Sequence, residues 1–485
     1  MLVNTRRFSL VILLLLGLAA VTACGGGGSD SSDSSGTVTA PTITTQPSSQ
    51  TVTAGSAASF TVTASGSGTL SYQWYKASSA ISGATSSTYT IASTATSDAG
   101  SYYVTVSNSG GTTTSSTVTL TVSSSDTASC DTTYVDSVLS AVSTFEAALG
   151  SSLTASTLYS DSSYSSSQLN VYKTNWSNLP PGAISFSRPG ITLAEVSTSS
   201  QISAFNALAK VALSSAGYAD FQGVIAADDY LGYTKNANGY GADLYHVAFI
   251  GTPSQTGSWT LMLGGHHMAF NINFNGACAY PTPHHIGVEP RTAFTANDHT
   301  SYSFYDSGTY TVLADKAAAM VAIFSSMSSS ELTSAFLSGQ TFSDVLIGPV
   351  EANTGSYANV TTKFNAIASS SDRGLLVSSL STTQQALVMA AIEQFTDDYD
   401  STTASRLLSD YEADYGSTYV AWANASGSVS SSGPDVSANG TYMRVDGPRV
   451  WMEIAVQNGV VISGQTHYHM IYRDKTYDYY NQLSN

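Results

Sequence analysis

Two short stretches of small polar residues divide this chain of 485 residues into separate parts. Residues 25–38 read GGGGSDSSDSSGTV, and residues 124–129 read SSDTAS. Neither stretch has enough apolar side chains to form a core. We therefore predict flexible linkers at 25–38 and 124–129, a small domain over residues 39–123 and a large domain over residues 130–485.

Residues 1–24 have the three parts of an export signal. Arg6 and Arg7 precede an apolar run over residues 8–20, and small residues lead to Cys24. The sequence before this cysteine resembles the lipoprotein box of bacterial signal peptides, which implies that Cys24 is acylated and becomes the first residue of the mature chain. An ordinary cleaved signal is the alternative. We expect an extracytoplasmic protein, held by its lipid at the outer membrane or the cell surface.

The charge balance excludes several classes of protein. The chain has 16 basic and 33 acidic residues and a net charge of -17, which repels the phosphate backbone of nucleic acids. A hydrophobic fraction of 42% argues against a disordered polyelectrolyte, and a single apolar run argues against a polytopic membrane protein. The expected partners are therefore the membrane, through the lipid, and an unidentified extracellular substrate or surface partner.

Two cysteines remain once Cys24 is assigned to a lipid. In an oxidising compartment, Cys130 and Cys278 are predicted to form a disulfide, with two separate buried thiols as the alternative. Neither lies in a CxxC pair, so a zinc ribbon or a thioredoxin-type redox site is not expected.

Residues 39–123 consist of short alternating segments separated by Gly, Ser and Thr, the spacing of a β-sandwich. The segment resembles an immunoglobulin-like domain, in which Trp74 takes the place of the core tryptophan and Tyr102 that of the tyrosine corner. Val62 and Val104 stand where antibody domains have cysteines. The resemblance implies an all-β sandwich held by packing alone, serving as a spacer or adhesion module.

Residues 130–485 are predicted to form one large α+β domain with an antiparallel sheet. Apolar residues recur at helical spacing, which predicts helices over 135–149, 202–215, 313–325, 331–338 and 383–396. Strand patterns occur over 243–251, 258–274 and 441–473, and hairpin turns are predicted at Asp446-Gly447 and Asn458-Gly459.

All eight histidines lie in the large domain, and six of them form three close groups. His467 and His469 alternate on a predicted strand, so both imidazoles point to one face and are candidate ligands of a single metal ion. His266 and His267 follow Gly264-Gly265 at the start of a segment, 264–274, that is predicted to be a strand. Alternation there places His267 on the polar face as a third ligand, with His266 as a further candidate.

The third group, His284-His285, supplies secondary candidates. A two-residue hairpin at Asn275-Gly276 would place Cys278 opposite Asn273, His284 opposite His267, and His285 opposite His266. The prolines between this turn and the histidines make the register less regular, because proline cannot donate to a β-ladder.

Arg473 and Glu453 are predicted catalytic residues. Arg473 follows His469 on the same face of the strand and could hold a substrate carboxylate, although an ion pair with Asp474 or Asp478 is the alternative. Glu453 could act as a base or a fourth ligand. A simple hairpin at Asn458-Gly459 would place it on the face opposite the histidines, so this role requires a bulge near Ser463-Gly464.

These groups predict a metal-dependent enzyme, and hydrolysis by zinc is the first hypothesis. Three neutral imidazoles suit zinc, which lowers the pKa of bound water to about 7. A copper-dependent oxidoreductase is the second hypothesis. The third is a non-enzymatic surface module that binds a glycan or a protein through an aromatic-rich domain, since the chain contains 29 tyrosines. The histidines could also be structural, or serve as acid and base without metal.

Three motifs resemble a bacterial family known only as a domain of unknown function, number thirty-five hundred in its series. They are GGHHMAFN at 264–271, the turn at 287–290, and HYHMIYRDKTYDY at 467–479. The similarity spans roughly residues 130–480 and implies a single large domain without an established activity.

Overall fold

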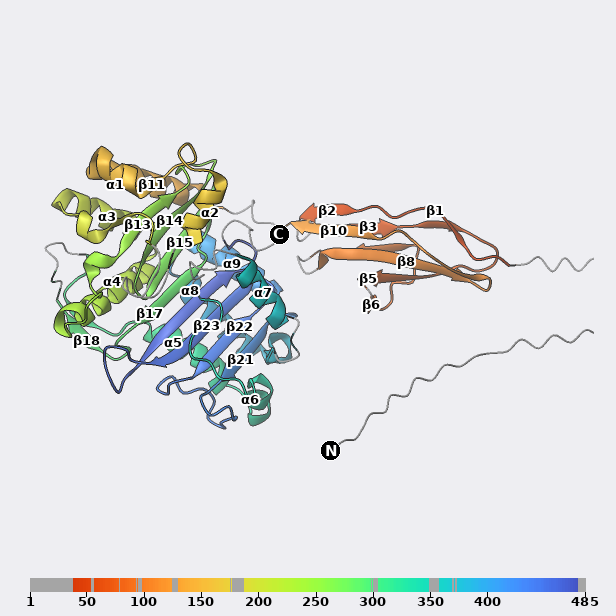
Figure 1. Cartoon of the computed structure of the whole chain (residues 1–485). Coiled ribbons are helices and arrows are strands. Elements are labelled where there is room, and N and C mark those ends of the chain that lie inside the picture. Colours follow the sequence, from red (N-terminus) through yellow and green to blue (C-terminus); the bar gives the residue numbers. More distant parts are fainter. Residues whose placement is uncertain are drawn as a thin grey trace, which may run out of the picture. The chain divides into compact units, whose positions relative to one another are not determined.

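The computed structural model describes residues 38–53, 56–77, 79–92, 94, 98–123, 130–174, 176, 187–297, 299, 304–348, 357–368, 370 and 373–478 (Figure 1). The predicted signal with Cys24, residues 25–37 of the first linker and the linker at 124–129 lie outside these residues. Two compact units are present, and each is described by itself. In the described part of the chain, no helix has both the length and the apolar character needed to cross a membrane.

The N-terminal unit is a β-sandwich. One sheet has the order β2-β10-β8-β5-β6 with β9 on β8, and the pairs β1-β4 and β3-β7 complete the strands. Trp74 and Tyr102 are buried in its core, and both rings pack against Phe60, at centroid distances of 6.1 and 5.0 Å. Val62 and Val104 are also buried, so apolar packing fills the positions of the missing disulfide. The immunoglobulin-like prediction is confirmed. The strands are β1 (Thr42–Thr45), β2 (Gln50–Thr53), β3 (Ala58–Thr61), β4 (Thr63–Ser65), β5 (Ser71–Lys76), β6 (Ser79–Ala80), β7 (Thr88–Ile91), β8 (Gly100–Asn108), β9 (Gly111–Thr114) and β10 (Val118–Ser123).

The described residues of the large unit form a 12-stranded sheet in the order β11-β13-β14-β15-β17-β24-β23-β22-β21-β20, with β12 on β13 and β16 on β15. Pairing is antiparallel from β13 to β20. The earlier and later parts of the domain meet at the β17–β24 pair, where green and blue strands adjoin in Figure 1. The strands are β11 (Leu158–Tyr159), β12 (Ile191–Thr192), β13 (His246–Ile250), β14 (Ser258–Gly265), β15 (Met268–Asn275), β16 (Cys278–Tyr280), β17 (His284–Val288), β20 (Leu375–Leu376), β21 (Tyr419–Ala423), β22 (Tyr442–Asp446), β23 (Val450–Asn458) and β24 (Thr466–Asp474); a separate pair is formed by β18 (Phe294–Ala296) and β19 (Gly308–Tyr310).

Helices cover both faces of this sheet. The main core lies under α1 (Thr132–Thr157), α3 (Ser199–Ala212), α4 (Ser215–Asp229), α5 (Ala314–Ser325), α6 (Ser329–Ala335), α8 (Thr382–Thr396) and α9 (Ser401–Ala413). A smaller apolar cluster on the other face includes residues of α2 (Ser166–Thr174) and α7 (Tyr357–Ala368). The predicted α+β class with an antiparallel sheet is confirmed.

The helix α1 shows how local sequence sets an element. Its buried residues recur every three or four positions, and Asp131 caps its start by accepting hydrogen bonds from the backbone N–H groups of Thr133 and Tyr134 at 2.8 and 3.2 Å. Gly150, predicted as the end of the helix, adopts a φ of 75° and breaks it, but a second helical segment continues to Thr157.

Three predictions of strand pairing were wrong. The predicted strand 258–274 is two strands, β14 and β15, which form a hairpin. At Asn275-Gly276 the register shifts, so that Asn275 rather than Asn273 lies opposite Cys278. The hairpin between β23 and β24 has a seven-residue loop, 459–465, instead of a two-residue turn at Asn458-Gly459. The β22–β23 connection lies close to the predicted turn at Asp446-Gly447 but not at it: Asp446 pairs with Trp451, and the N–H of Gly447 donates to the carbonyl of Val450 at 2.8 Å, so the turn falls at residues 448–449.

The predicted disulfide is present. Cys130 and Cys278 are bonded with a Cα–Cα distance of 4.9 Å across 148 residues of sequence. It ties the start of α1 to β16, which excludes the alternative of two separate thiols.

Candidate metal centre

The strand β24 presents different residues to the two faces of the sheet. Tyr468, Met470 and Tyr472 belong to the main core under the helices. Because side chains alternate along a strand, His467 and His469 point to the opposite face. Both are nearly inaccessible to solvent, with exposed fractions of 1% and 5%.

A second pair of histidines lies at the tip of the β14–β15 hairpin. Gly265 pairs with Met268, so His266 and His267 are the two residues of the turn and not part of a strand. His267 has a φ of 60°, in the left-handed region that few residues other than glycine adopt. The predicted alternation of these two side chains was therefore wrong, because a turn places both of them beyond the end of the sheet ladder.

The structure brings His267, His467 and His469 together. One ligand nitrogen of each lies within 4.8 Å of those of the other two, so this group could hold a metal ion. The ring centroid of His267 is 5.5 Å from that of His467 and 5.3 Å from that of His469. The two histidines of β24 are 4.9 Å apart by the same measure.

Gly287 makes the meeting of these rings possible. It pairs with His469 across β17 and β24, and its N–H donates to the carbonyl of His267 at 2.6 Å. A Cβ atom at this position would lie 2.7 Å from the carbonyl oxygen of Tyr468, 3.1 Å from Cδ2 of His267 and 3.2 Å from Cδ2 of His469. The rings therefore occupy the space that a side chain at position 287 would fill.

Burial keeps the imidazoles of His267 and His467 neutral. It lowers the pKa of His267 well below its ordinary value, and the neighbouring histidines lower it further. It also lowers the pKa of His467 to about 3, assisted by His469. Nδ1 of His467 is buried and has no hydrogen-bond partner in the described part of the chain. A neutral imidazole has a lone pair free for a metal, whereas an imidazolium has none.

His469 is oriented by polar neighbours. Its Nδ1 lies 2.8 Å from Oδ1 of Asp344 and 3.1 Å from Nε2 of Gln457. Burial raises the pKa of Asp344, but the hydrogen bond and charge of His469 outweigh it, so that the pKa lies below its ordinary value. His469 can offer one ring nitrogen to the possible metal group. A carboxylate on the outer nitrogen is the usual support of a metal-binding histidine.

His266 lies in a second group with Asp228 and His267, whose ligand atoms also fall within 4.8 Å of one another. Nδ1 of His266 is 2.5 Å from Oδ1 of Asp228, the distance of a short hydrogen bond. Burial raises the pKa of Asp228, while His266 opposes the shift. Tyr240 packs its ring edge against His266 at 4.7 Å. His266 is thus held beside the three-histidine group by its carboxylate partner.

The secondary candidates take different positions. His284 lies opposite Phe270 and His285 opposite Ala269, and not opposite His267 and His266 respectively as predicted, because the chain shifts register before β17. His284 packs in the main core against Phe270, with a centroid distance of 4.3 Å. His285 faces the other side, 5.6 Å from the ring of His469. Both nitrogens of His285 are buried without a hydrogen-bond partner among the described residues.

Glu453 lies on the face of the sheet that carries His467. The seven-residue loop makes Glu453 pair with Ile471, which removes the objection from a simple hairpin register. Its two oxygens accept hydrogen bonds from four donors, at distances of 2.6 to 2.9 Å: the backbone N–H groups of Leu346 and Ile347, the Tyr442 hydroxyl and the Trp451 indole N–H. The structure thus places Glu453 as an anchor of residues 346–347, outside both possible metal groups.

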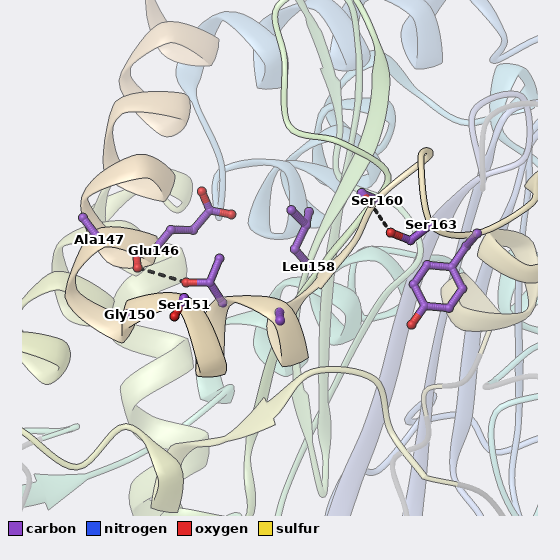
Figure 2. Close-up of a pocket in the computed structure, with 10 residues that line it drawn as sticks. Glu146, Ala147, Gly150, Ser151, Leu158, Ser160 and Ser163 are labelled. Atoms are coloured by element: carbon purple, nitrogen blue, oxygen red, sulfur yellow. Dashed lines mark hydrogen bonds between the residues drawn. The ribbon is translucent and has the colours of Figure 1, made fainter.

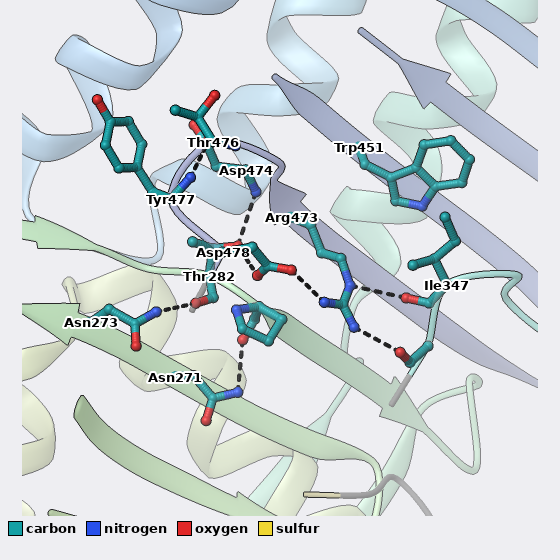
Figure 3. Close-up of polar contacts among 12 residues, drawn as sticks. Asn271, Asn273, Thr282, Ile347, Trp451, Arg473, Asp474, Thr476, Tyr477 and Asp478 are labelled. Atoms are coloured by element: carbon teal, nitrogen blue, oxygen red, sulfur yellow. Dashed lines mark hydrogen bonds and ion pairs between the residues drawn. The ribbon is translucent and has the colours of Figure 1, made fainter. Parts of the chain in front are cut away.

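Arg473 is also held in place. Figure 3 shows its guanidinium directed at Asp478 and at the carbonyls of residues 347 and 348. The distance from Nη1 to Oδ2 of Asp478 is 2.5 Å, and Nε and Nη2 donate to the carbonyls of Ile347 and Gly348 at 3.0 and 2.7 Å. Arg473 and Asp478 both have an exposed fraction of 0%. The ion pair with Asp478, the alternative considered from sequence, is the one observed.

A separate pocket of about 580 Å³ opens at the break in α1 (Figure 2). It is lined by Glu146, Gly150 and Leu158, among others, and by Ser160 and Ser163, whose hydroxyls are 3.0 Å apart. Burial raises the pKa of Glu146. None of the histidines lines this pocket, so it is distinct from the candidate metal centre.

Asp228, Asp344 and Gly287 were not among the site residues predicted from the sequence. Asp228 is the second-last residue of α4, in which nearly every residue after Phe221 is buried, so no apolar stripe reveals it. A pair of acidic residues directly after an apolar run is the one local signal of a buried carboxylate there. No local signal marks Asp344, which reaches His469 from 125 residues away.

Comparison with solved structures finds similarity to immunoglobulin domains. A chimeric titin Z1Z2 tandem shares 29% identity, covering 18% of this chain and 51% of that chain, with a TM-score of 0.17. Immunoglobulin domains 1–5 of Sidekick-1 share 25% identity, covering 18% and 20%, with a TM-score of 0.17. Extracellular domains 3–5 of Drosophila OTK share 23% identity, covering 18% and 32%, with a TM-score of 0.16. This chain thus spans about half of the titin tandem. No curated protein matches the chain.

Two family models match the chain. The model of the immunoglobulin domain matches residues 40–108. A second model, described as a protein of unknown function (DUF3500), matches residues 131–481, which include every histidine of the candidate site and most of the chain. By this match and by the motifs around its paired histidines, the chain belongs to the DUF3500 family.

Proposed function

We propose that the large domain is a zinc-dependent hydrolase, with His267, His467 and His469 as the metal ligands. The observation that carries this proposal is the approach of one nitrogen from each ring to within 4.8 Å of the others. These residues come from a hairpin turn and from a strand about 200 residues later in the sequence, so their meeting is a property of the tertiary structure.

The surroundings of the three rings support a metal site. The lowered pKa values of His267 and His467 leave their lone pairs unprotonated. His469 has the carboxylate support that fixes the ring orientation of metal-binding histidines. Three imidazoles form the ligand set of catalytic zinc sites that keep a fourth position for water or substrate.

The chemistry follows from the donor set. Zinc bound by three neutral nitrogen ligands would supply a water with a pKa of about 7 as a nucleophile. The chain contributes orientation, because Asp344 holds His469 and Asp228 holds His266 next to His267. Copper would bind the same ligands and is the second candidate, since imidazole suits Cu(II).

We also propose that the protein is exported and held at a membrane by a lipid. The export signal over residues 1–24 and the lipid site at Cys24 support a protein anchored on the extracytoplasmic side of a membrane, with the immunoglobulin-like domain as a spacer. Replacing Cys24 by Ser should move the exported chain from the membrane fraction to the soluble fraction. Retention of the variant in the membrane would contradict a lipid anchor.

Metal analysis of the purified protein tests the proposed site. The chain is stripped with a chelator, supplied separately with Zn²⁺ and Cu²⁺, and its metal content is measured by mass spectrometry after gel filtration. We expect one zinc per chain and hydrolysis of p-nitrophenyl acetate that requires the zinc. His467→Ala should lose both, whereas the matched variant His246→Ala, on β13 and outside both possible metal groups, should keep both.

Three outcomes would count against the hydrolase. Preferential binding of copper with oxidase activity would favour the oxidoreductase. Zinc binding without hydrolysis would leave a metal-binding surface module. Failure to bind either metal would overturn the site itself.

A further inference from the structure

A pocket of about 360 Å³ lies at the C-terminal end of α4, next to the histidine cluster. Its walls include two tyrosines, two aspartates and a histidine: Tyr233, Tyr240, Asp229, Asp243 and His299. Together these residues combine aromatic surface with hydrogen-bonding groups in one concave site.

Two consecutive acidic residues at the end of α4 contact the candidate metal centre and the pocket. Asp228 hydrogen-bonds His266 on the side of the cluster, and Asp229 hydrogen-bonds His299 on the side of the pocket, with Oδ2 3.0 Å from Nδ1. The Tyr305 hydroxyl also donates to Asp229, at 2.6 Å. His299 is therefore held in a fixed orientation with its Nδ1 engaged, which leaves Nε2 as its remaining polar atom.

Tyr233 supplies the exposed aromatic surface of the pocket. Its exposed fraction is 63%, which is unusual for a large aromatic side chain in a folded domain. One face of its ring stacks on His299, with a centroid distance of 3.5 Å and an interplanar angle of 16°. The stacking fixes the ring in position at the wall of the pocket, where it can meet the apolar face of a ligand.

The charges of the lining select the class of ligand. Asp229 and Asp243 are acidic, and none of the lining residues is a lysine or an arginine. This arrangement disfavours phosphate, sulfate and carboxylate groups. The lining offers both acceptors, in the carboxylates, and donors, in the tyrosine hydroxyls and the imidazole. Hydroxyl groups are donors and acceptors at once, so a neutral ligand with many hydroxyls and an apolar C–H face fits this lining.

We propose that the pocket binds a neutral saccharide unit, with Tyr233 contacting the C–H face of the sugar and with Asp243 and His299 contacting its hydroxyls. Binding of the sugar does not require the metal. The position of the pocket suggests a second step, which rests on the proposed function. Tyr240 lines the pocket and packs against His266, while the N–H of Gly241, also in the lining, donates to Asp228 at 3.3 Å. A saccharide in the pocket would therefore be part of the substrate of the hydrolase.

The test is a calorimetric titration of the purified chain with four neutral oligosaccharides, namely cellohexaose, xylohexaose, maltohexaose and chitohexaose. A hexauronic acid serves as the anionic probe and choline as the cationic probe. We expect at least one neutral oligosaccharide to bind, and the hexauronic acid not to bind. Absence of binding by all four neutral sugars at millimolar concentration would overturn the proposal, and so would binding of choline alone.

Two variants locate the bound sugar. Tyr233→Ala should weaken binding about five- to tenfold, because an aromatic contact of this kind is lost. Asp243→Asn should weaken it in the same direction with little change in shape. Tyr103→Ala in the immunoglobulin-like unit and Asp315→Asn at the start of α5 are the matched controls and should bind as the wild type does. Equal affinity of Tyr233→Ala and the wild type would place the sugar elsewhere.

The metal-site variant separates this proposal from the proposed function. His467→Ala should lose zinc and keep the affinity for the sugar. If it keeps zinc while the wild type binds sugar, the ligand assignment fails and the pocket stands. If no sugar binds to the wild type, but the wild type binds zinc and His467→Ala does not, the pocket proposal fails and the metal site stands. Wild-type, zinc-loaded protein that binds an oligosaccharide without cleaving it would overturn only the assignment of that sugar as substrate.

Discussion

The two faces of the large sheet differ in what their residues do. Along β24, Tyr468, Met470 and Tyr472 pack into the apolar core under the helices. The alternate residues of the same strand, His467, His469 and Arg473, enter a face where buried polar groups pair with one another or approach a possible metal site. A single strand thus contributes to the main core on one side and to the candidate metal centre on the other.

This difference separates the main apolar core from the buried polar groups around the candidate metal centre. Buried apolar area on the helix face stabilises the fold. The other face has a smaller apolar cluster, which includes Ile471, and it also carries imidazoles and the Arg473–Asp478 ion pair, whose burial is unfavourable unless each has a partner. Because strand alternation keeps these histidines out of the main core, we expect changes at the site to leave the packing of the main core intact. Four substitutions test this division.

The largest effect is expected at Arg473, on the polar face. Arg473→Ala should lower the free energy of unfolding of the metal-free protein by about 3–5 kcal/mol, because it leaves Asp478 buried without its cation. Urea denaturation followed by circular dichroism measures the change. Arg291→Ala, which removes a partly exposed arginine, is the control and should cost less than about 1 kcal/mol. Unchanged stability together with lost activity would instead indicate a substrate-binding role for Arg473.

A substitution on the helix face should act on stability alone. Met470→Ala removes a side chain with an exposed fraction of 0% and should lower the free energy of unfolding by about 2–5 kcal/mol through the cavity that it leaves. Metal content per folded chain should not change. Val460→Ala, at a side chain with an exposed fraction of 74%, is the control. Loss of metal from folded Met470→Ala protein would show that the two faces are coupled.

The pH dependence of stability should reveal the buried imidazoles. The pKa of His467 is about 3 in the folded protein and near 6.5 when unfolded, so only the unfolded chain binds a proton between these values. The free energy of unfolding of metal-free protein should therefore fall as the pH falls below about 6.5. Between pH 7 and pH 5 we expect the wild type to lose about 2 kcal/mol more than His467→Gln. Parallel pH profiles of the two proteins would contradict a buried, neutral His467.

The smallest effect is expected at Gly287. Gly287→Ala places a methyl group 2.7 Å from the carbonyl oxygen of Tyr468 and against the rings of His267 and His469. Both the β17–β24 ladder and the rings must then shift, and metal binding should weaken about tenfold, which corresponds to about 1.4 kcal/mol. Competition with a chromogenic zinc chelator measures the affinity. Gly264→Ala, whose added methyl group would have only a 3.3 Å contact with a backbone oxygen, is the matched control and should bind metal normally. Equal affinities of the two variants would show that the rings need no such space.

Much of the fold follows from local patterns. The apolar repeat from Val135 to Leu149 and the capping residue Asp131 mark the first helix without reference to the rest of the chain. The helix α4 could not be predicted in this way, because nearly every residue after Phe221 is buried and the helix shows no apolar periodicity. The register between strands could not be predicted from local patterns either. The pairing of β23 with β24 depends on a seven-residue loop whose conformation no dipeptide predicts.

Part of the candidate site could also be predicted from local sequence. Alternation alone aligns His467 with His469, because the two lie on one strand. The same rule failed at His266 and His267, since a hairpin turn interrupts the strand there. Their meeting with His469 depends on Gly287, a residue whose importance appears only when its neighbours in space are known.

The amino-acid sequence by itself determined the division into an immunoglobulin-like part and a large α+β part, the candidate disulfide and the histidine-rich strands, because composition and short-range periodicity carry that information. Only the tertiary structure decided which histidines meet, which carboxylates orient them and that Arg473 is bound to Asp478. The reason is physical: a site assembled from residues more than a hundred positions apart depends on strand order and register, and these are set by packing of the whole domain.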